Sequence, residues 1–274
     1  MDRDVLLDRR AAIMGVLNVT PDSFSDGGRS ATVDVALENG RRLSREGADI
    51  VDVGGESTRP GASPVSLEDE QARVAPVVEA LAGESSVTIS IDTIKPEVAR
   101  LALRLGAAIV NDMNGLRDPE MLRVVAESNA GVVVGHMRGE PRTMQKGPRY
   151  DDVVLEVYDW LAARVELAVS AGIARERIAI DLGIGFGKTI EHNLALLRNL
   201  SRFAGLDCAI MIGVSRKGFL GALTGRPVEA REFATVAANL AAVSRGANIL
   251  RVHDVAATLD SLRVWNAIDD GTRL

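Results

Sequence analysis

The chain has 274 residues, of which 46% are hydrophobic and 26% charged, and its formal net charge is −6. The acidic balance and the 3% of aromatic residues argue against a nucleic-acid-binding surface. The single cysteine, Cys208, excludes a disulfide within the chain and a multi-cysteine metal site. No apolar run reaches the roughly 18 residues of a membrane span, and the charged N-terminus lacks the apolar part of a signal peptide. We therefore expect a soluble cytoplasmic protein with no membrane partner.

Eight short apolar runs rich in Val and Ile recur along the chain. They occupy residues 11–19, 49–55, 87–92, 107–112, 131–136, 177–183, 208–215 and 248–253. Their nearly continuous apolar character is typical of parallel strands buried on both faces. Amphipathic helical stretches lie between the runs, for example at 33–47 and 151–172.

Alternating strand and helix units predict an α/β fold, specifically a (β/α)8 TIM barrel in one domain over residues 11–274. Residues 1–10 are expected to form a frayed tail. Long loops follow the first two strands, at 20–28 and 55–62, and we predict that they act as lids over an active site. The alternative is a doubly wound open sheet, but no G-x-G-x-x-G sequence follows the first run.

Every predicted strand delivers polar or charged side chains at its carboxyl end, where barrel enzymes place their chemistry. These residues include Asn18, Arg59, Asp92, Asn111, Asp112, His136, Asp181, Ser215, Lys217, Arg251 and His253. For Asp112 or Arg216 alone, a cap or a solvated loop residue is the better explanation. Eight strands that end in the same way favour a functional site.

The charges at these ends suggest a ligand with two chemical faces. Asp92 and Asp181 follow apolar runs, so each carboxylate needs a donor partner, such as the paired N–H edge of a ligand. Arg59, Lys217, Arg251 and His253 follow strands 2, 7 and 8, and strands 7 and 8 of a barrel commonly bind phosphate. The Gly-rich stretch at 181–189 matches neither phosphate-loop nor dinucleotide spacing, and we expect it to pass close under a flat ligand.

The chain resembles the bacterial dihydropteroate synthases over nearly its whole length. The stretches that carry the resemblance are MGVLNVTPDSFSDGG (14–28), DVGGESTRPGA (52–62), SIDT (90–93), VNDMNG (110–115), GIGFGKT (183–189), SRKGFLG (215–221) and RVHDV (251–255). The resemblance implies a TIM-barrel transferase that is a homodimer. It also implies condensation of 6-hydroxymethyl-7,8-dihydropterin diphosphate with 4-aminobenzoate to 7,8-dihydropteroate and diphosphate, in folate biosynthesis.

The resemblance further assigns roles to residues. It places the pterin on Asp92, Asn111, Asp181 and Lys217. It places the diphosphate on Asn18, Arg251 and His253, with Mg²⁺ beside Asn18. It places 4-aminobenzoate, and sulfonamides that mimic it, on Thr58, Arg59, Pro60, Phe186, Ser215 and Lys217, under a lid carrying Pro21 and Phe24. The residues expected to act in catalysis are Asp92, Lys217, Arg251 and His253.

The chain departs from the family pattern at three positions. Leu182 replaces the usual proline of Asp-Pro-Gly, Gly135 replaces Met or a similar apolar residue, and Asn114 stands where serine is frequent. These departures leave open a catalytically weak or silent pterin-binding paralogue. Two other barrel enzymes remain as alternatives: a methyltransferase acting on methyltetrahydrofolate, and an aldolase using Lys217 as a Schiff-base amine.

Overall fold

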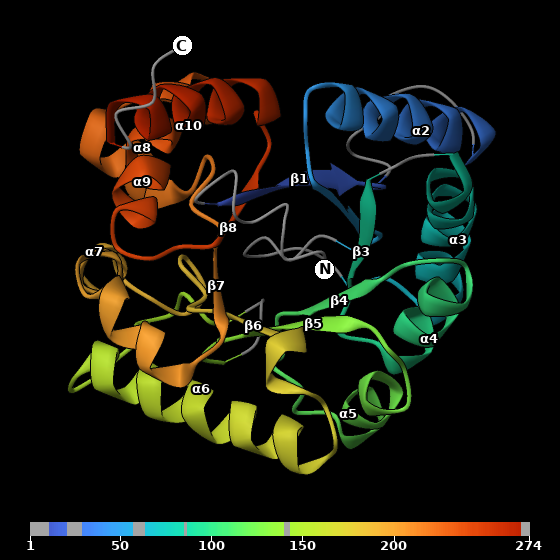
Figure 1. Ribbon diagram of the computed structural model, residues 1–274, viewed down its shortest axis with the longest axis horizontal. Coiled ribbons are helices and arrows are strands. Elements are labelled where there is room, and N and C mark those ends of the chain that lie inside the picture. Colours follow the sequence, from blue (N-terminus) through green and yellow to red (C-terminus); the bar gives the residue numbers. More distant parts are fainter. Residues whose placement is uncertain (1–10, 21–28, 57–63, 85–86, 140–142, 270–274) are drawn as a thin grey trace.

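The computed structural model describes residues 11–20, 29–56, 64–84, 87–139 and 143–269. Eight parallel strands pair in chain order and close, β1 pairing with β8, into the barrel at the centre of Figure 1. The strands are β1 (Ala12–Asn18), β2 (Ile50–Gly54), β3 (Thr88–Asp92), β4 (Ile109–Asp112), β5 (Gly131–Gly135), β6 (Ile178–Asp181), β7 (Ala209–Ile212) and β8 (Ile249–Val252). The predicted TIM barrel is confirmed, and the open sheet is excluded.

Helices surround the barrel in a ring (Figure 1). The α-helices are α2 (Arg29–Arg45), α3 (Leu67–Glu84), α4 (Pro96–Arg104), α5 (Pro119–Ala126), α6 (Val153–Ser170), α7 (Ile190–Arg198), α8 (Gly218–Thr224), α9 (Glu232–Val243) and α10 (Val255–Asp269). Short 3-10 helices lie at η2 (Arg175–Arg177), η3 (Leu200–Leu206) and η4 (Val228–Ala230). Two helices, α8 and α9, connect β7 to β8, where a single helix would complete the simple repeat. No helix in these ranges is long and apolar enough to cross a membrane.

Strand side chains alternate between two apolar layers, as period-two geometry requires. Outward-facing residues such as Val51, Val110 and Ile180 pack in the main core with the surrounding helices. Inward-facing residues form a second cluster inside the barrel: Ala12, Met14, Ile50, Ile109, Val133, Ala179, Met211 and Ile249. This inner apolar cluster fills the barrel interior below the carboxyl ends of the strands.

The inward face changes from apolar to polar two residues further along several strands. Ile50 is followed at that spacing by Asp52, Ile109 by Asn111, Ala179 by Asp181, and Ile249 by Arg251. The strand register sets Gly54 beside Asp92, Asp92 beside Asn111, and Gly135 beside Asp181. The fold thus gathers buried polar groups at the carboxyl end of the barrel.

Candidate active site

Arg251 is the centre of a largely buried charged cluster inside the barrel. Its Nε donates to Oδ2 of Asp52 at 2.7 Å, and its Nη2 donates to Oδ2 of Asp92 at 2.6 Å. Nδ2 of Asn111 donates to the same Asp52 oxygen at 3.0 Å. Both carboxylates are buried, and the Arg251 side chain, itself 21% exposed, neutralises their charge. The structure thus gives Arg251 two carboxylate partners; its role toward a diphosphate stays a prediction.

Burial and the neighbouring Arg251 charge act in opposite directions on the pKa of Asp92. Burial raises the pKa of this carboxyl to about 7, while Arg251 acts to lower that pKa and Asp52 to raise it. Arg251 is itself affected, since the two carboxylates raise its pKa and keep it protonated. The cluster therefore holds Asp92 where a small change of charge nearby alters its protonation.

Asp181 ends β6 and turns the chain into the glycine-rich stretch. Its Oδ1 accepts a hydrogen bond from the backbone N–H of Gly183 at 2.8 Å. Burial raises the pKa of the Asp181 carboxyl, and the Gly183 N–H and Lys217 oppose that rise. The next side chain, Leu182, is fully buried in the outer core. The departure from proline therefore adds no side chain to the polar interior.

Lys217 approaches Asp181 from the loop after β7. Its Nζ donates to the carbonyl of Ile184 at 2.6 Å and lies 4.1 Å from the centre of the Phe186 ring. Burial lowers the pKa of Lys217 to about 8, although Asp181 acts to raise it. Three predicted site residues thus meet across the β6 and β7 loops.

Ser215 and His253 connect the loops after β7 and β8. Ser215 Oγ and His253 Nδ1 lie 2.9 Å apart, and the backbone N–H of His253 donates to the same oxygen at 3.2 Å. Asn18 ends β1 on the inward face, half-buried and in register with Gly54. The structure brings these three together with the cluster above at one end of the barrel. Pro21, Phe24, Thr58, Arg59 and Pro60 lie outside the described residues.

Two buried neighbours of the candidate site, Asp52 and Lys188, are not among the residues predicted from the sequence. Asp52 lies within an apolar run. Only its two-residue spacing from Ile50, which places both side chains on the inward face of the strand, could have identified it. Buried Lys188 contacts Nδ1 of His136 at 2.9 Å and donates to the carbonyls of Gly183 at 3.0 Å and Phe186 at 3.1 Å. Burial lowers the pKa of Lys188 to about 7. Lys188 therefore holds together the loop that carries Phe186.

The packing of Met113 explains why a glycine occupies position 135. A Cβ at position 135 would lie 2.8 Å from both the Cα and the Sδ of Met113. Met113 is buried and follows the β4 end that carries Asn111. The methionine side chain thus occupies the space next to Gly135. The third departure, Asn114, donates its backbone N–H to Oδ1 of Asp112, whose other oxygen accepts from Leu116, so Asp112 stabilises a turn.

Replacing Gly183 by Ala is expected to lower the free energy of unfolding by more than the roughly 1 kcal/mol lost on conformational grounds. Gly183 has a φ of +65°, and a Cβ there would lie 1.8 Å from the carbonyl oxygen of His136. The matched control is Gly172→Ala, since Gly172 has a φ of +95° but no atom within 4 Å of its Cβ position. Urea unfolding of both variants measures the difference. Equal losses would show that the backbone contact with His136 is unimportant.

The pH dependence of kcat/KM is expected to have an alkaline limb set by Lys217. Because its pKa is lowered to about 8, the ammonium loses its proton as pH rises through that value, and binding through that charge weakens. Lys217→Arg should remove the limb, since a guanidinium stays protonated in this range. Profiles of both proteins between about pH 6 and 10 test this. An unchanged limb in the variant would assign the titration elsewhere.

The fold and the site define a barrel enzyme with a buried polar pocket for a small ligand. The family model "Pterin binding enzyme" matches residues 14–253. The chain is 46% identical to the dihydropteroate synthase of Haemophilus influenzae over 93% of each chain. The Xanthomonas albilineans dihydropteroate synthase with 4-aminobenzoic acid has a TM-score of 0.91 and 49% identity, covering 96% of this chain and 94% of the other. The Burkholderia cenocepacia enzyme complexed with 7,8-dihydropteroate has a TM-score of 0.86 and 49% identity, over 95% and 92%.

The chain therefore belongs to the dihydropteroate synthases of the pterin-binding enzyme family. The resemblance drawn from the sequence motifs is confirmed, as is the assignment to the transferases. The comparisons do not favour the aldolase alternative.

Proposed function

We propose that this chain condenses 6-hydroxymethyl-7,8-dihydropterin diphosphate with 4-aminobenzoate, giving 7,8-dihydropteroate and diphosphate. The observation that supports this most is the convergence of Asp92, Asn111, Asp181 and Lys217 at one end of the barrel. A pterin has an edge of N–H donors, and a buried carboxylate such as Asp181 needs such donors. The similar enzymes solved with 4-aminobenzoic acid and with 7,8-dihydropteroate bind the second substrate and the product of this reaction.

The reaction we propose begins with loss of diphosphate. The C–O bond between the pterin methylene and the diphosphate breaks, and its electron pair leaves with the diphosphate oxygen. The positive charge left on the methylene is shared with the pterin ring, and the buried carboxylate of Asp92 favours that charge electrostatically. The amine nitrogen of 4-aminobenzoate then attacks the methylene carbon and releases a proton.

The remaining predicted residues have supporting roles in this scheme. His253 and Arg251 lie at the end of β8, where the Arg251 charge and a ring nitrogen of His253 would bind a departing diphosphate. Phe186, beside the Lys217 ammonium, offers an aromatic wall for 4-aminobenzoate, with Ser215 nearby. Because sulfonamides mimic this substrate, they are expected to compete with it.

Asn18 fits the magnesium site that the family resemblance implies. Its amide oxygen is a hard donor at the inward end of β1, and Mg²⁺ usually takes few protein ligands together with phosphate oxygens and water. The described residues contain no group of three His, Cys, Asp or Glu that would hold a metal by themselves. When bound, Mg²⁺ would stabilise the charge that develops on the leaving diphosphate. Asn18→Ala should therefore raise the Mg²⁺ concentration needed for activity and for binding of diphosphate alone.

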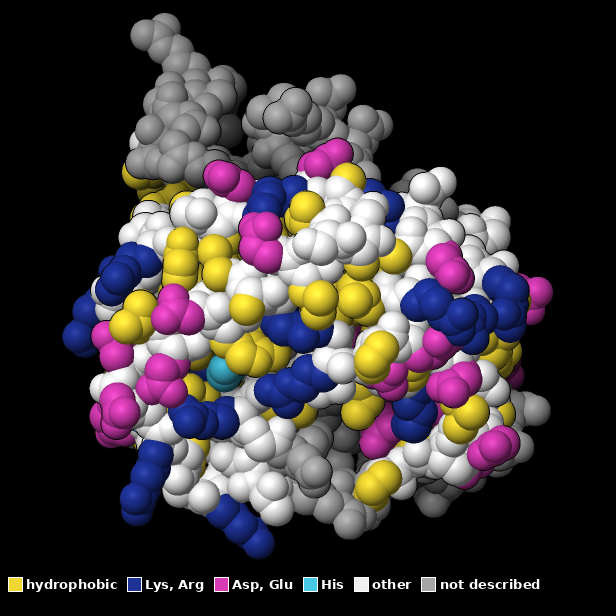
Figure 2. All heavy atoms as spheres, turned by 90° about the horizontal axis from the view of Figure 1, so that it is seen from below, with side chains coloured by type: hydrophobic (Ala, Val, Ile, Leu, Met, Phe, Trp, Pro, Cys, Tyr) yellow, Lys and Arg dark blue, Asp and Glu magenta, His cyan; other side chains and the backbone are white. Residues whose placement is uncertain are grey.

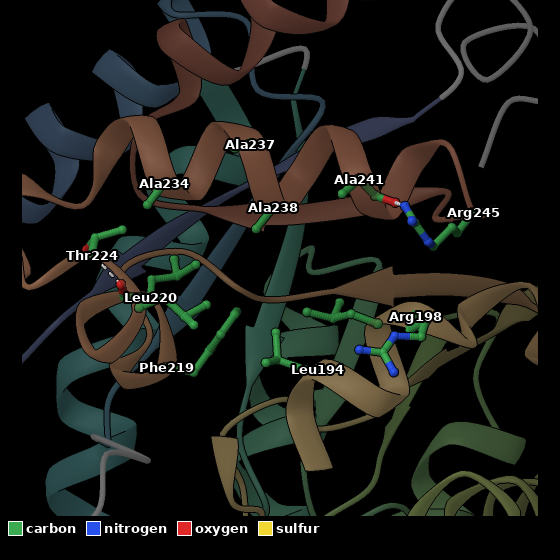
Figure 3. A pocket seen from close by; sticks show the side chains of 12 residues that line it. Leu194, Arg198, Phe219, Leu220, Thr224, Ala234, Ala237, Ala238, Ala241 and Arg245 are labelled. Atoms are coloured by element: carbon green, nitrogen blue, oxygen red, sulfur yellow. Dashed lines mark hydrogen bonds between the residues drawn. The ribbon is translucent and has the colours of Figure 1, made fainter. Parts of the chain in front are cut away.

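We also propose that the chain forms a homodimer through α8, η4 and α9. Phe233 is 86% exposed and Leu223 58%, and Val228 lies between them in the sequence. Beside them, α7, α8 and α9 line an apolar cavity of about 450 Å³ (Figure 3). Exposed large apolar side chains next to an apolar cavity are typical of a surface that associates with a second copy. Light scattering should give twice the chain mass for the natural protein and a lighter species for Phe233→Glu; equal masses would contradict this surface.

The reaction itself supplies no reason for a nucleic-acid partner or for transport out of the cytoplasm. On the face shown in Figure 2, described basic and acidic side chains are interspersed, which does not favour a nucleic-acid surface. The free thiol of Cys208 fits the reducing cytoplasm in which we place the enzyme.

The test of the proposed function is a product assay. The purified chain is mixed with the pterin diphosphate, Mg²⁺ and 4-aminobenzoate, and both diphosphate and dihydropteroate are measured. Equal yields that require all three additions would support the synthase. Pterin binding without any product would indicate the silent paralogue.

A further inference from the structure

The loop after β7 holds a non-glycine residue in an unfavourable backbone conformation. Arg216 has a φ of +59°, in the left-handed region that side-chain-bearing residues seldom adopt. Such residues persist only where surrounding contacts hold them, and they are frequent at functional sites. Arg216 lies between Ser215 and Lys217, both of which belong to the candidate site.

Contacts from two other segments hold Arg216 in this conformation. Its guanidinium forms a two-point ion pair with Asp254, with Nη2 2.6 Å from Oδ1 and Nε 3.2 Å from Oδ2. Its backbone N–H donates to Thr235 Oγ1 at 3.1 Å, and its carbonyl accepts from Arg231 Nη1 at 2.9 Å. Both α9 and the segment after β8 therefore fix this loop.

Gly221 on α8 makes room for one of these contacts. A Cβ at that position would lie 2.2 Å from Nη2 of Arg231 and 2.5 Å from its Cζ. The Arg231 guanidinium thus passes directly over the glycine to reach the Arg216 carbonyl. The loop is fixed by a set of matched residues, of which the Arg216–Asp254 pair is one part.

The ion pair joins the two loops that carry the expected anion-binding groups. Asp254 directly follows His253, and Arg216 directly follows Ser215. Ser215 and His253 contact each other at 2.9 Å. The Arg216–Asp254 ion pair and the Ser215–His253 contact therefore connect the same two loops at neighbouring positions. On its other side, Arg216 precedes Lys217, whose Nζ reaches the carbonyl of Ile184.

We propose that Arg216 and Asp254 are positioning residues, which set Ser215, Lys217 and His253 relative to one another without touching either substrate. This inference rests on the proposed function. The two side chains are 36% and 23% exposed, and partly exposed ion pairs contribute little to overall stability. The pair should therefore matter more for the geometry of the site than for folding.

Substitutions separate the ion pair from the backbone strain. Arg216→Gly removes the pair and relieves the strained φ, Arg216→Ala removes the pair alone, and Asp254→Asn removes one charge. Arg216→Lys keeps the charge but not the two-point geometry. The control is Arg263→Ala, which removes an exposed ion pair with Asp260 on α10.

Both Arg216→Gly and Asp254→Asn are expected to lower kcat/KM by about 10- to 100-fold, the scale of a small misplacement in an active site. Their unfolding midpoints should stay within a few degrees of the natural protein. Arg216→Lys should retain part of the activity that Arg216→Gly loses. The double variant Arg216→Ala, Asp254→Ala should have a kcat/KM no lower than Arg216→Ala or Asp254→Ala alone, because each single change already removes the ion pair. Natural activity in Arg216→Gly, or independent effects of the two alanine changes, would overturn the proposal.

Hydrogen exchange of the segment 213–220 tests the same inference without substrate. Exchange should become faster in Arg216→Gly and Asp254→Asn and stay unchanged in Arg263→Ala. Unchanged exchange in all three variants would overturn the positioning role. Failure of the natural protein to form dihydropteroate would contradict the proposed function instead. The exchange result would still test whether Arg216 and Asp254 hold the loop in place.

Discussion

Replacing Arg251 by Met is expected to lower the free energy of unfolding by about 3–5 kcal/mol, the usual effect of removing one partner from a buried ion pair. Met has a similar length and no charge, so Asp52 and Asp92 would lose the cation that lies between them. Both carboxylates are buried, and neither can recover its charge stabilisation from water. Denaturant unfolding at neutral pH measures the loss.

The loss should depend on pH with a definite sign. The pKa of Asp92 is already raised above its ordinary value of 3.8 to about 7. A folded-state pKa above the unfolded one gives stability that is present at low pH and lost as pH rises through the folded value. Removing Arg251 takes away the main influence that lowers this pKa. The difference between the variant and the natural protein should therefore widen as pH rises above about 7, where Asp92 ionises in the natural protein and stays protonated in the variant.

Two further variants make this test specific. Asp52→Asn added to Arg251→Met should restore part of the stability, because it removes one of the two unpaired charges. Arg263→Ala removes an arginine from an exposed pair on α10 and should change stability by less than about 1 kcal/mol. A loss in Arg251→Met that is independent of pH, and is not relieved by Asp52→Asn, would mean that lost packing rather than charge explains it.

Replacing Asp181 by Asn is expected to lower kcat/KM for the pterin diphosphate by about 10- to 150-fold. Hydrogen bonds to a charged group contribute about 1.5–3 kcal/mol each, and we propose that the pterin donates at least one to this carboxylate. Asn keeps an oxygen that can accept from the Gly183 N–H, so the turn after β6 should survive. Steady-state kinetics with varied pterin diphosphate give the ratio.

The control for this change is Asp159→Asn on the exposed face of α6, which should leave kcat/KM unaltered. The two variants carry the same change in net charge, so an effect confined to Asp181 cannot arise from charge in general. Natural kinetics in Asp181→Asn, with the fold intact, would remove Asp181 from the pterin site.

Residue pattern alone predicted the barrel well, because buried parallel strands require continuous apolar runs and each run ends in a turn. The polar ends of β3, β4, β6 and β8 do come together, as closure of the barrel requires. The family resemblance then supplied roles that strand ends could not, such as the separation of pterin-binding from diphosphate-binding residues. Those roles stay predictions until the variants are measured.

Other parts of the site depend on contacts between distant segments and could not be predicted. Asp52 was not among the predicted site residues because its neighbours in the strand are apolar, and only the pairing with Arg251, from the opposite end of the chain, reveals its place in the polar cluster. Arg216 looked like a solvated loop residue because neither its positive φ nor its pairing with Asp254 is visible in one sequence. Gly135 looked like a loss until the space beside it proved to hold Met113.

The most direct test of the central claim, that this pocket breaks the C–O bond before the amine attacks, is a positional isotope exchange measurement. The oxygen that bridges the pterin methylene and the diphosphate is labelled with a heavy isotope, and the substrate is incubated with enzyme and Mg²⁺ in the absence of 4-aminobenzoate. We predict that the label moves to non-bridging positions of recovered substrate. A label that stays in the bridge, in enzyme that forms dihydropteroate once 4-aminobenzoate is added, would contradict this mechanism.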